Sequence, residues 1–96
     1  MKMIMIVYNY SVHAELLEEL KTCGVKYHTC IEKVSGVGGR GPRMGDNIWP
    51  GINNVMYVAA TKEALAKKVI EAVKDVKSRF REEGIQAWLW NVDAEI

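Results

Sequence analysis

The sequence predicts an α+β fold in which strands and helices follow one another in the order βαββαβ. Three observations support this order: short apolar runs of strand length, two amphipathic segments of helical periodicity, and one glycine-rich stretch between the two halves. A chain of 96 residues has room for one domain. We assign that domain to residues 1–96, with a flexible loop at about 36–53.

The first half of the chain predicts a strand, a helix and a second strand. Residues 2–8 are an apolar run, and Ser11 is a suitable N-cap for a helix over about 12–23. Gly24 stands where a helix commonly ends in a glycine. Residues 25–34 are rich in β-forming side chains and predict the second strand.

The second half repeats this content after the glycine-rich loop. Residues 54–60 and 86–92 predict strands, and Thr61 predicts the N-cap of a helix over 62–83. The apolar stripe of this helix is Leu65, Val69, Ala72, Val73, Val76 and Phe80. Joined by right-handed crossovers, these elements give a ferredoxin-like βαββαβ fold, with a four-stranded antiparallel sheet and two helices on one face.

The face of the sheet opposite the helices is predicted to be apolar as well. Three strands are apolar on both faces: Met3, Met5 and Val7 alternate with Ile4, Ile6 and Tyr8, Val55, Tyr57 and Ala59 alternate with Met56, Val58 and Ala60, and Trp88, Trp90 and Val92 alternate with Ala87 and Leu89. Because an uncovered apolar face associates, we expect a homo-oligomer that buries it. Flanking loops that cover the face are the alternative.

The composition excludes several classes of protein. With 13 basic and 12 acidic residues, the net charge of +1 argues against nucleic acid as a partner. Two cysteines form no disulfide framework, and no apolar run reaches the ~18 residues of a membrane span. We therefore expect a cytoplasmic protein. No catalytic constellation is recognisable, so we do not expect an enzyme.

The loop is the first candidate site. Residues 36–51 contain six glycines and two prolines. The spacing of Gly36, Gly38 and Gly41 matches a dinucleotide fingerprint by letter only, because no helix follows it. Backbone amides beside these glycines, together with Arg40 and Arg43, could still bind an anion. A loop with two solvated arginines is the alternative.

Two weaker patterns have structural explanations. His28 and Cys30 would share one strand face and are weak candidates for a soft metal site, but no metal-ligand spacing occurs, and packing is the better interpretation.

Trp88 and Trp90 alternate on one strand, as do the aromatic residues of RNA-recognition modules, but the basic motif of those modules is missing. We interpret the two tryptophans as interface residues.

The layout resembles the PII signal-transduction family of trimeric ferredoxin-like proteins. Met1, Lys2 and Gly24 fit the opening strand and helix of that family. Its second strand and loop entrance are matched by Thr29, Glu32, Val34, Gly36, Val37 and Gly38, and its last strand by residues 88–92. The likeness covers most of the chain.

The resemblance implies a homotrimer that binds a small effector between subunits and signals through the loop to a membrane transporter or an enzyme. The implied ligand-binding residues are Thr29, Gly36, Val37, Gly38, Gly39, Arg40 and Arg43. The connection at 81–86 lacks the glycine-rich B-loop of the family, and the family's C-terminal basic residues are missing. We therefore expect a more weakly bound adenine nucleotide (ATP, ADP or AMP) or bicarbonate as the ligand, without ordinary ATP and 2-oxoglutarate sensing. A metal-tolerance protein of the same fold and a purely structural oligomer module are the alternatives.

Overall fold

The computed structural model describes residues 1–35, 37–38, 41–42 and 52–96. The elements are β1 (Lys2–Asn9), the 3-10 turn η1 (Tyr10–Val12), α1 (His13–Thr22), β2 (Thr29–Val34), β3 (Val37–Gly38), β4 (Gly41–Pro42), β5 (Asn53–Ala60), α2 (Glu63–Arg79) and β6 (Ile85–Asn91). Within these ranges, neither helix is long and apolar enough to span a membrane.

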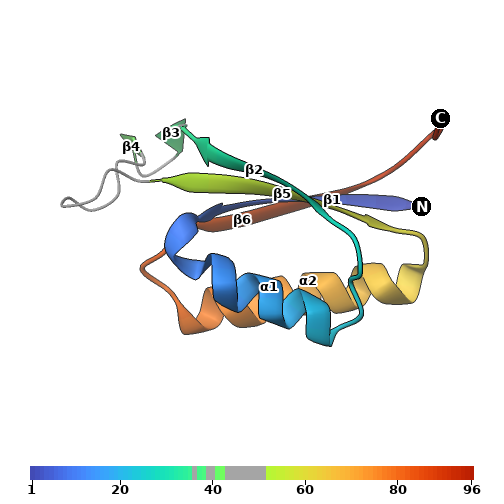
Figure 1. Cartoon of the computed structure of the whole chain (residues 1–96), viewed down its shortest axis with the longest axis horizontal. Coiled ribbons are helices and arrows are strands. Elements are labelled where there is room, and N and C mark those ends of the chain that lie inside the picture. The colour runs from blue at the N-terminus through green and yellow to red at the C-terminus, as the bar shows by residue number, and fades with distance from the viewer. Residues whose placement is uncertain (36, 39–40, 43–51) are drawn as a thin grey trace.

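The main sheet has four strands in the order β2-β5-β1-β6, and every neighbouring pair is antiparallel. Both helices lie on the same face of this sheet (Figure 1). The small hairpin β3–β4 lies at the end of the sheet where β2 ends and β5 begins (Figure 1). The predicted ferredoxin-like α+β fold is therefore confirmed.

The core lies between the sheet and the two helices. In β1, alternate side chains point into it, so Ile4, Ile6 and Tyr8 are fully buried. The turn η1 contributes Val12, and the two helices contribute Leu16, Leu20, Ala66, Val69, Ala72, Val73 and Val76. Each large apolar side chain buried in this way stabilises the fold by about 1.5–3 kcal/mol. The stripe predicted for the second helix is confirmed, with Leu65 and Phe80 at its partly buried margin.

The first helix begins differently from the prediction. Ser11 is not its N-cap: the side chain of Asn9 accepts a hydrogen bond from the Ser11 backbone N–H at 2.9 Å and caps η1. The chain therefore makes a 3-10 turn before α1 begins at His13.

The end of α1 agrees with the prediction. Gly24 adopts φ +108°. Its N–H bonds to the Lys21 carbonyl, and the Val25 N–H bonds to the Leu20 carbonyl, which is a Schellman motif.

Two other predicted bounds are wrong. The strand predicted over 25–34 begins only at Thr29, because Val25 is buried in the core and its N–H closes α1, which holds this part of the chain near the helix layer. The helix predicted over 62–83 spans Glu63–Arg79, and Thr61 does not cap it. Lys62 is the N-cap residue, without a side-chain hydrogen bond. At the other end Phe80 leaves helical geometry.

β2 is irregular just before the chain enters the long loop. Its pairing with β5 shifts register between Ile31 and Val34, and Lys33 has a left-handed φ of 59°. A non-glycine residue in this region costs about 1–3 kcal/mol. The Lys33 N–H donates to Oδ1 of Asn54, a buried side chain of β5, at 3.3 Å. This bond supports the bulge and so helps to fix where the loop leaves the sheet.

Replacing Gly24 by alanine should destabilise the fold by about 1 kcal/mol, because an L side chain is strained at this positive φ. A Cβ atom there would lie 3.9 Å from Leu65 Cδ1, so strain and not a clash is the cause. Thermal unfolding should show a fall in Tm of roughly 4–8 °C. Gly84→Ala is the matched control, because Gly24 is the only positive-φ glycine among the described residues. Equal effects of the two changes would contradict this account.

Replacing Asn54 by leucine should destabilise the protein by about 1–3 kcal/mol, since it removes the acceptor of the Lys33 N–H from a buried position. Urea unfolding measures this loss. Asn91→Leu, at the exposed end of β6, is the control and should change the free energy of unfolding little. A stability of Asn54→Leu within error of wild type would show that the bulge does not need this bond.

Candidate ligand site and open sheet face

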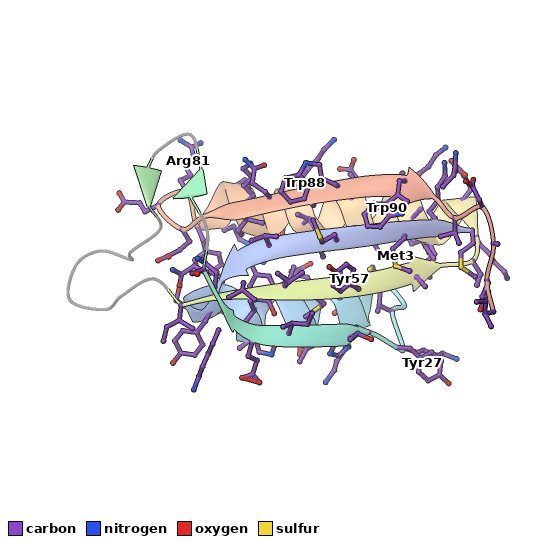
Figure 2. The ribbon with its side chains drawn as sticks, turned by 90° about the horizontal axis from the view of Figure 1, so that it is seen from above. Met3, Tyr27, Tyr57, Arg81, Trp88 and Trp90 are labelled. Atoms are coloured by element: carbon purple, nitrogen blue, oxygen red, sulfur yellow. The ribbon has the colours of Figure 1, made fainter. Side chains whose placement is uncertain are left out.

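One face of the main sheet carries no helix. Figure 2 views this face, with Met3, Tyr57, Trp88 and Trp90 labelled on it. The register aligns its side chains in rows across the strands, which are Ala59–Met3–Trp90, Thr29–Tyr57–Met5–Trp88 and Ile31–Val55–Val7–Gln86. We call these residues the open face.

The open face is mostly apolar and partly exposed. Trp88, Trp90 and Ile31 expose 49%, 43% and 48% of their surface. Nothing among the described residues covers them, so the alternative of flanking loops over this face receives no support there. Contiguous apolar surface of this kind is typical of interaction sites.

The predicted ligand-binding residues divide into two groups. Thr29, Val37 and Gly38 are described, whereas Gly36, Gly39, Arg40 and Arg43 lie outside the described residues. Thr29 is exposed at the start of β2, opposite Tyr57 of β5. Val37 and Gly38 form β3 and pair with Pro42 and Gly41.

Within one subunit, β2 separates Thr29 from β3. They lie at opposite ends of this strand, which has six residues, a separation of roughly 16 Å at the usual rise per residue. A ligand that touched both would have to run along the edge of the sheet.

The connection between α2 and β6 contributes a cation that the sequence analysis did not single out. Arg81 is exposed in this connection. It lies at the same end of the sheet as the β3–β4 hairpin (Figures 1 and 2). The available signal was a basic residue in the short connection at 81–86, but only the fold places it at the end of the sheet that carries the β3–β4 hairpin.

A second group of polar side chains lies where β1, α1 and β2 meet. The Tyr8 hydroxyl is 2.6 Å from His13 Nδ1 and 3.6 Å from Cys30 Sγ. The rings of Tyr8 and His13 are stacked, with centroids 5.8 Å apart. Burial, helped by the hydrogen bond with Cys30, raises the pKa of the Tyr8 phenol far above its usual value.

His28 does not belong to this group. It lies before the start of β2 and is exposed, so the expectation that His28 and Cys30 share a strand face is wrong. The part of the chain that the structure describes holds no group of three or more histidine, cysteine, aspartate or glutamate side chains suited to a metal ion.

Comparison with solved structures agrees with the fold. A putative PII-like signalling protein from Thermus thermophilus is 25% identical, with a TM-score of 0.69, and the match covers 95% of this chain and 85% of that one. CPII from Thiomonas intermedia, a nitrogen regulatory PII-like protein bound to ADP, AMP and bicarbonate, is 17% identical with a TM-score of 0.69, over 93% and 82% of the two chains.

A second structure of CPII, bound to ADP and bicarbonate, is 21% identical with a TM-score of 0.63 and covers 97% and 88% of the two chains. No curated protein matches this chain. The family model described as "Nitrogen regulatory protein P-II" matches residues 1–90. Together with the ferredoxin-like topology, this match over nearly the whole length shows that the chain belongs to the nitrogen regulatory protein P-II family.

Proposed function

We propose that this protein is a PII-like regulator that assembles as a homotrimer, binds a small anionic effector between subunits and signals through its long loop. The observation that carries the proposal is the apolar open face beside β2, the strand that leads into the loop. P-II family proteins are regulatory oligomers that bind small effectors, and they are not enzymes.

The trimer is supported by the chemistry of the open face. Tryptophan, tyrosine and methionine are enriched at protein interfaces, and here they come from adjacent strands of a rigid sheet. Burying the two half-exposed tryptophans against a second subunit removes a large apolar area from water.

The effector is proposed to be an adenine nucleotide or bicarbonate. The CPII structures hold ADP, AMP and bicarbonate, which supports these ligand classes. We assign Thr29 to the adenine, and Gly36, Val37, Gly38 and Gly39 to the phosphates through their backbone amides, following the family resemblance.

Arginine side chains would supply the positive charge for the anion. Arg40 and Arg43 are the loop residues assigned to this role, and Arg81 is added from its place at the same end of the sheet. A ligand that reached both Thr29 and the hairpin would extend along the whole of β2, which favours a nucleotide with its phosphate chain over bicarbonate for contact with both groups.

The output is proposed to be a change in how the loop contacts a partner protein. Effector binding would bias the loop between arrangements that such a partner, a membrane transporter or an enzyme, distinguishes. We expect the protein to act in the cytoplasm, where these effectors are present.

Replacing Trp88 by glutamate should break the trimer, because a carboxylate on the open face would have to be buried without a partner. Light scattering after size exclusion should give three times the chain mass for wild type and the mass of a monomer for the variant. Tyr27→Glu is the matched control: it also replaces an exposed aromatic residue, but outside the open face, and should stay trimeric. A monomeric wild type, or a trimeric Trp88→Glu, would refute the proposed assembly.

Nucleotide or bicarbonate binding should stabilise the protein against heat, by about 2.7 kcal/mol at a ligand concentration of 100 Kd. Calorimetry and thermal shift with ATP, ADP, AMP and bicarbonate measure this. Arg40→Ala should weaken binding of the phosphate-bearing ligands about tenfold, since it removes a charge-assisted hydrogen bond. Lys77→Ala, an exposed cation on α2, is the control. If no ligand of the panel binds, the protein is better described as a structural oligomer module.

A further inference from the structure

The Tyr8 group places a thiol within reach of an imidazole through one hydroxyl. A thiol, a phenol and an imidazole are joined in one hydrogen-bonded row, from Cys30 Sγ to the Tyr8 hydroxyl at 3.6 Å and on to His13 Nδ1 at 2.6 Å. The three side chains come from β2, β1 and α1 and are part-buried. They play no part in the ligand site described above.

One arrangement of these hydrogen bonds suits proton transfer away from sulfur. When the Tyr8 hydroxyl donates to Nδ1, its oxygen is free to accept from the Cys30 S–H. Stacking against Tyr8, with an interplanar angle of 12°, orients the imidazole. A cysteine proton can therefore pass to the phenol oxygen while the phenol proton passes to His13, which leaves a thiolate and an imidazolium.

The other cysteine provides an internal contrast. The Cys23 thiol donates to the Leu20 carbonyl at 3.3 Å and packs against the core. Burial raises the pKa of this thiol, so Cys23 is poorly suited to react. The Cys23 thiol is therefore hydrogen-bonded to the backbone, whereas the Cys30 thiol is hydrogen-bonded to the Tyr8–His13 pair.

We propose that Cys30 is a site of thiol–disulfide exchange with low-molecular-weight disulfides such as glutathione disulfide. The proton of Cys30 moves through Tyr8 to His13, and the thiolate attacks one sulfur of the disulfide. A Cys30–glutathione disulfide forms as the glutathione S–S bond breaks. The leaving glutathione thiolate takes the proton back from His13, so no other oxidant is consumed.

The location of Cys30 permits access. β2 is an edge strand that pairs only with β5, and Cys30 is partly exposed on it. An adduct there would be attached one residue after Thr29, on the strand that enters the long loop. The exchange itself does not depend on the proposed effector binding.

The test is the rate of mixed-disulfide formation, followed by mass spectrometry with glutathione disulfide as the probe. Cys23→Ser leaves Cys30 as the one thiol, and Cys30→Ser leaves Cys23. Cys30 should react at least about tenfold faster in the folded protein than in urea, whereas Cys23 should react more slowly folded than unfolded. Comparison with the unfolded chain separates activation from mere exposure.

Tyr8→Phe and His13→Ala, each in the Cys23→Ser background, should slow the folded-state reaction of Cys30 about tenfold. Circular dichroism checks that both variants remain folded, and His28→Ala, an exposed histidine outside the group, should leave the rate unchanged. The proposal is overturned if Cys30 reacts no faster folded than unfolded, or if neither Tyr8→Phe nor His13→Ala slows it.

Discussion

Two helices cover only one face of a four-stranded sheet, and the rest of this structure depends on that constraint. The covered face supplies a core that includes Tyr8, Ile4, Ile6 and Met56, closed by the α2 stripe. The other face retains aromatic and methionine side chains that water does not favour. A sheet that is apolar on both sides gives the protein its core on one face and, in the proposed trimer, its subunit interface on the other.

Much of the fold could be predicted because strand alternation is visible in the sequence. In β1 and β5 the buried and less buried side chains alternate as the two-residue period requires. The ends of helices and strands were harder to predict. Ser11 and Thr61 have the chemistry of N-caps, but a 3-10 turn capped by Asn9 precedes one helix, and the extended Lys62 precedes the other. The residue that caps a helix depends on how the chain enters the core, which the local sequence does not determine.

The candidate sites were predictable to different degrees. Thr29 and the glycine-rich loop could be found from a local pattern and a family resemblance. The contact of Tyr8, His13 and Cys30 could not, because it depends on the register of three separate elements. The sequence pattern suggested His28 as the neighbour of Cys30, but β2 begins after His28. The polar side chains grouped with Cys30 come from β1 and α1 instead. Spacing within one segment does not reveal such a cluster.

The open face also affects how the protein becomes stable in the first place. A single newly made chain can complete its core, but Trp88 and Trp90 stay half in water until a partner arrives. A molecule that covers that face increases the free energy of unfolding, and the increase grows with the concentration of that molecule. If the cover is a second copy of the chain, as proposed, the resistance of this protein to unfolding depends on its abundance as well as on its sequence. Dilution should weaken it without changing any contact within the subunit.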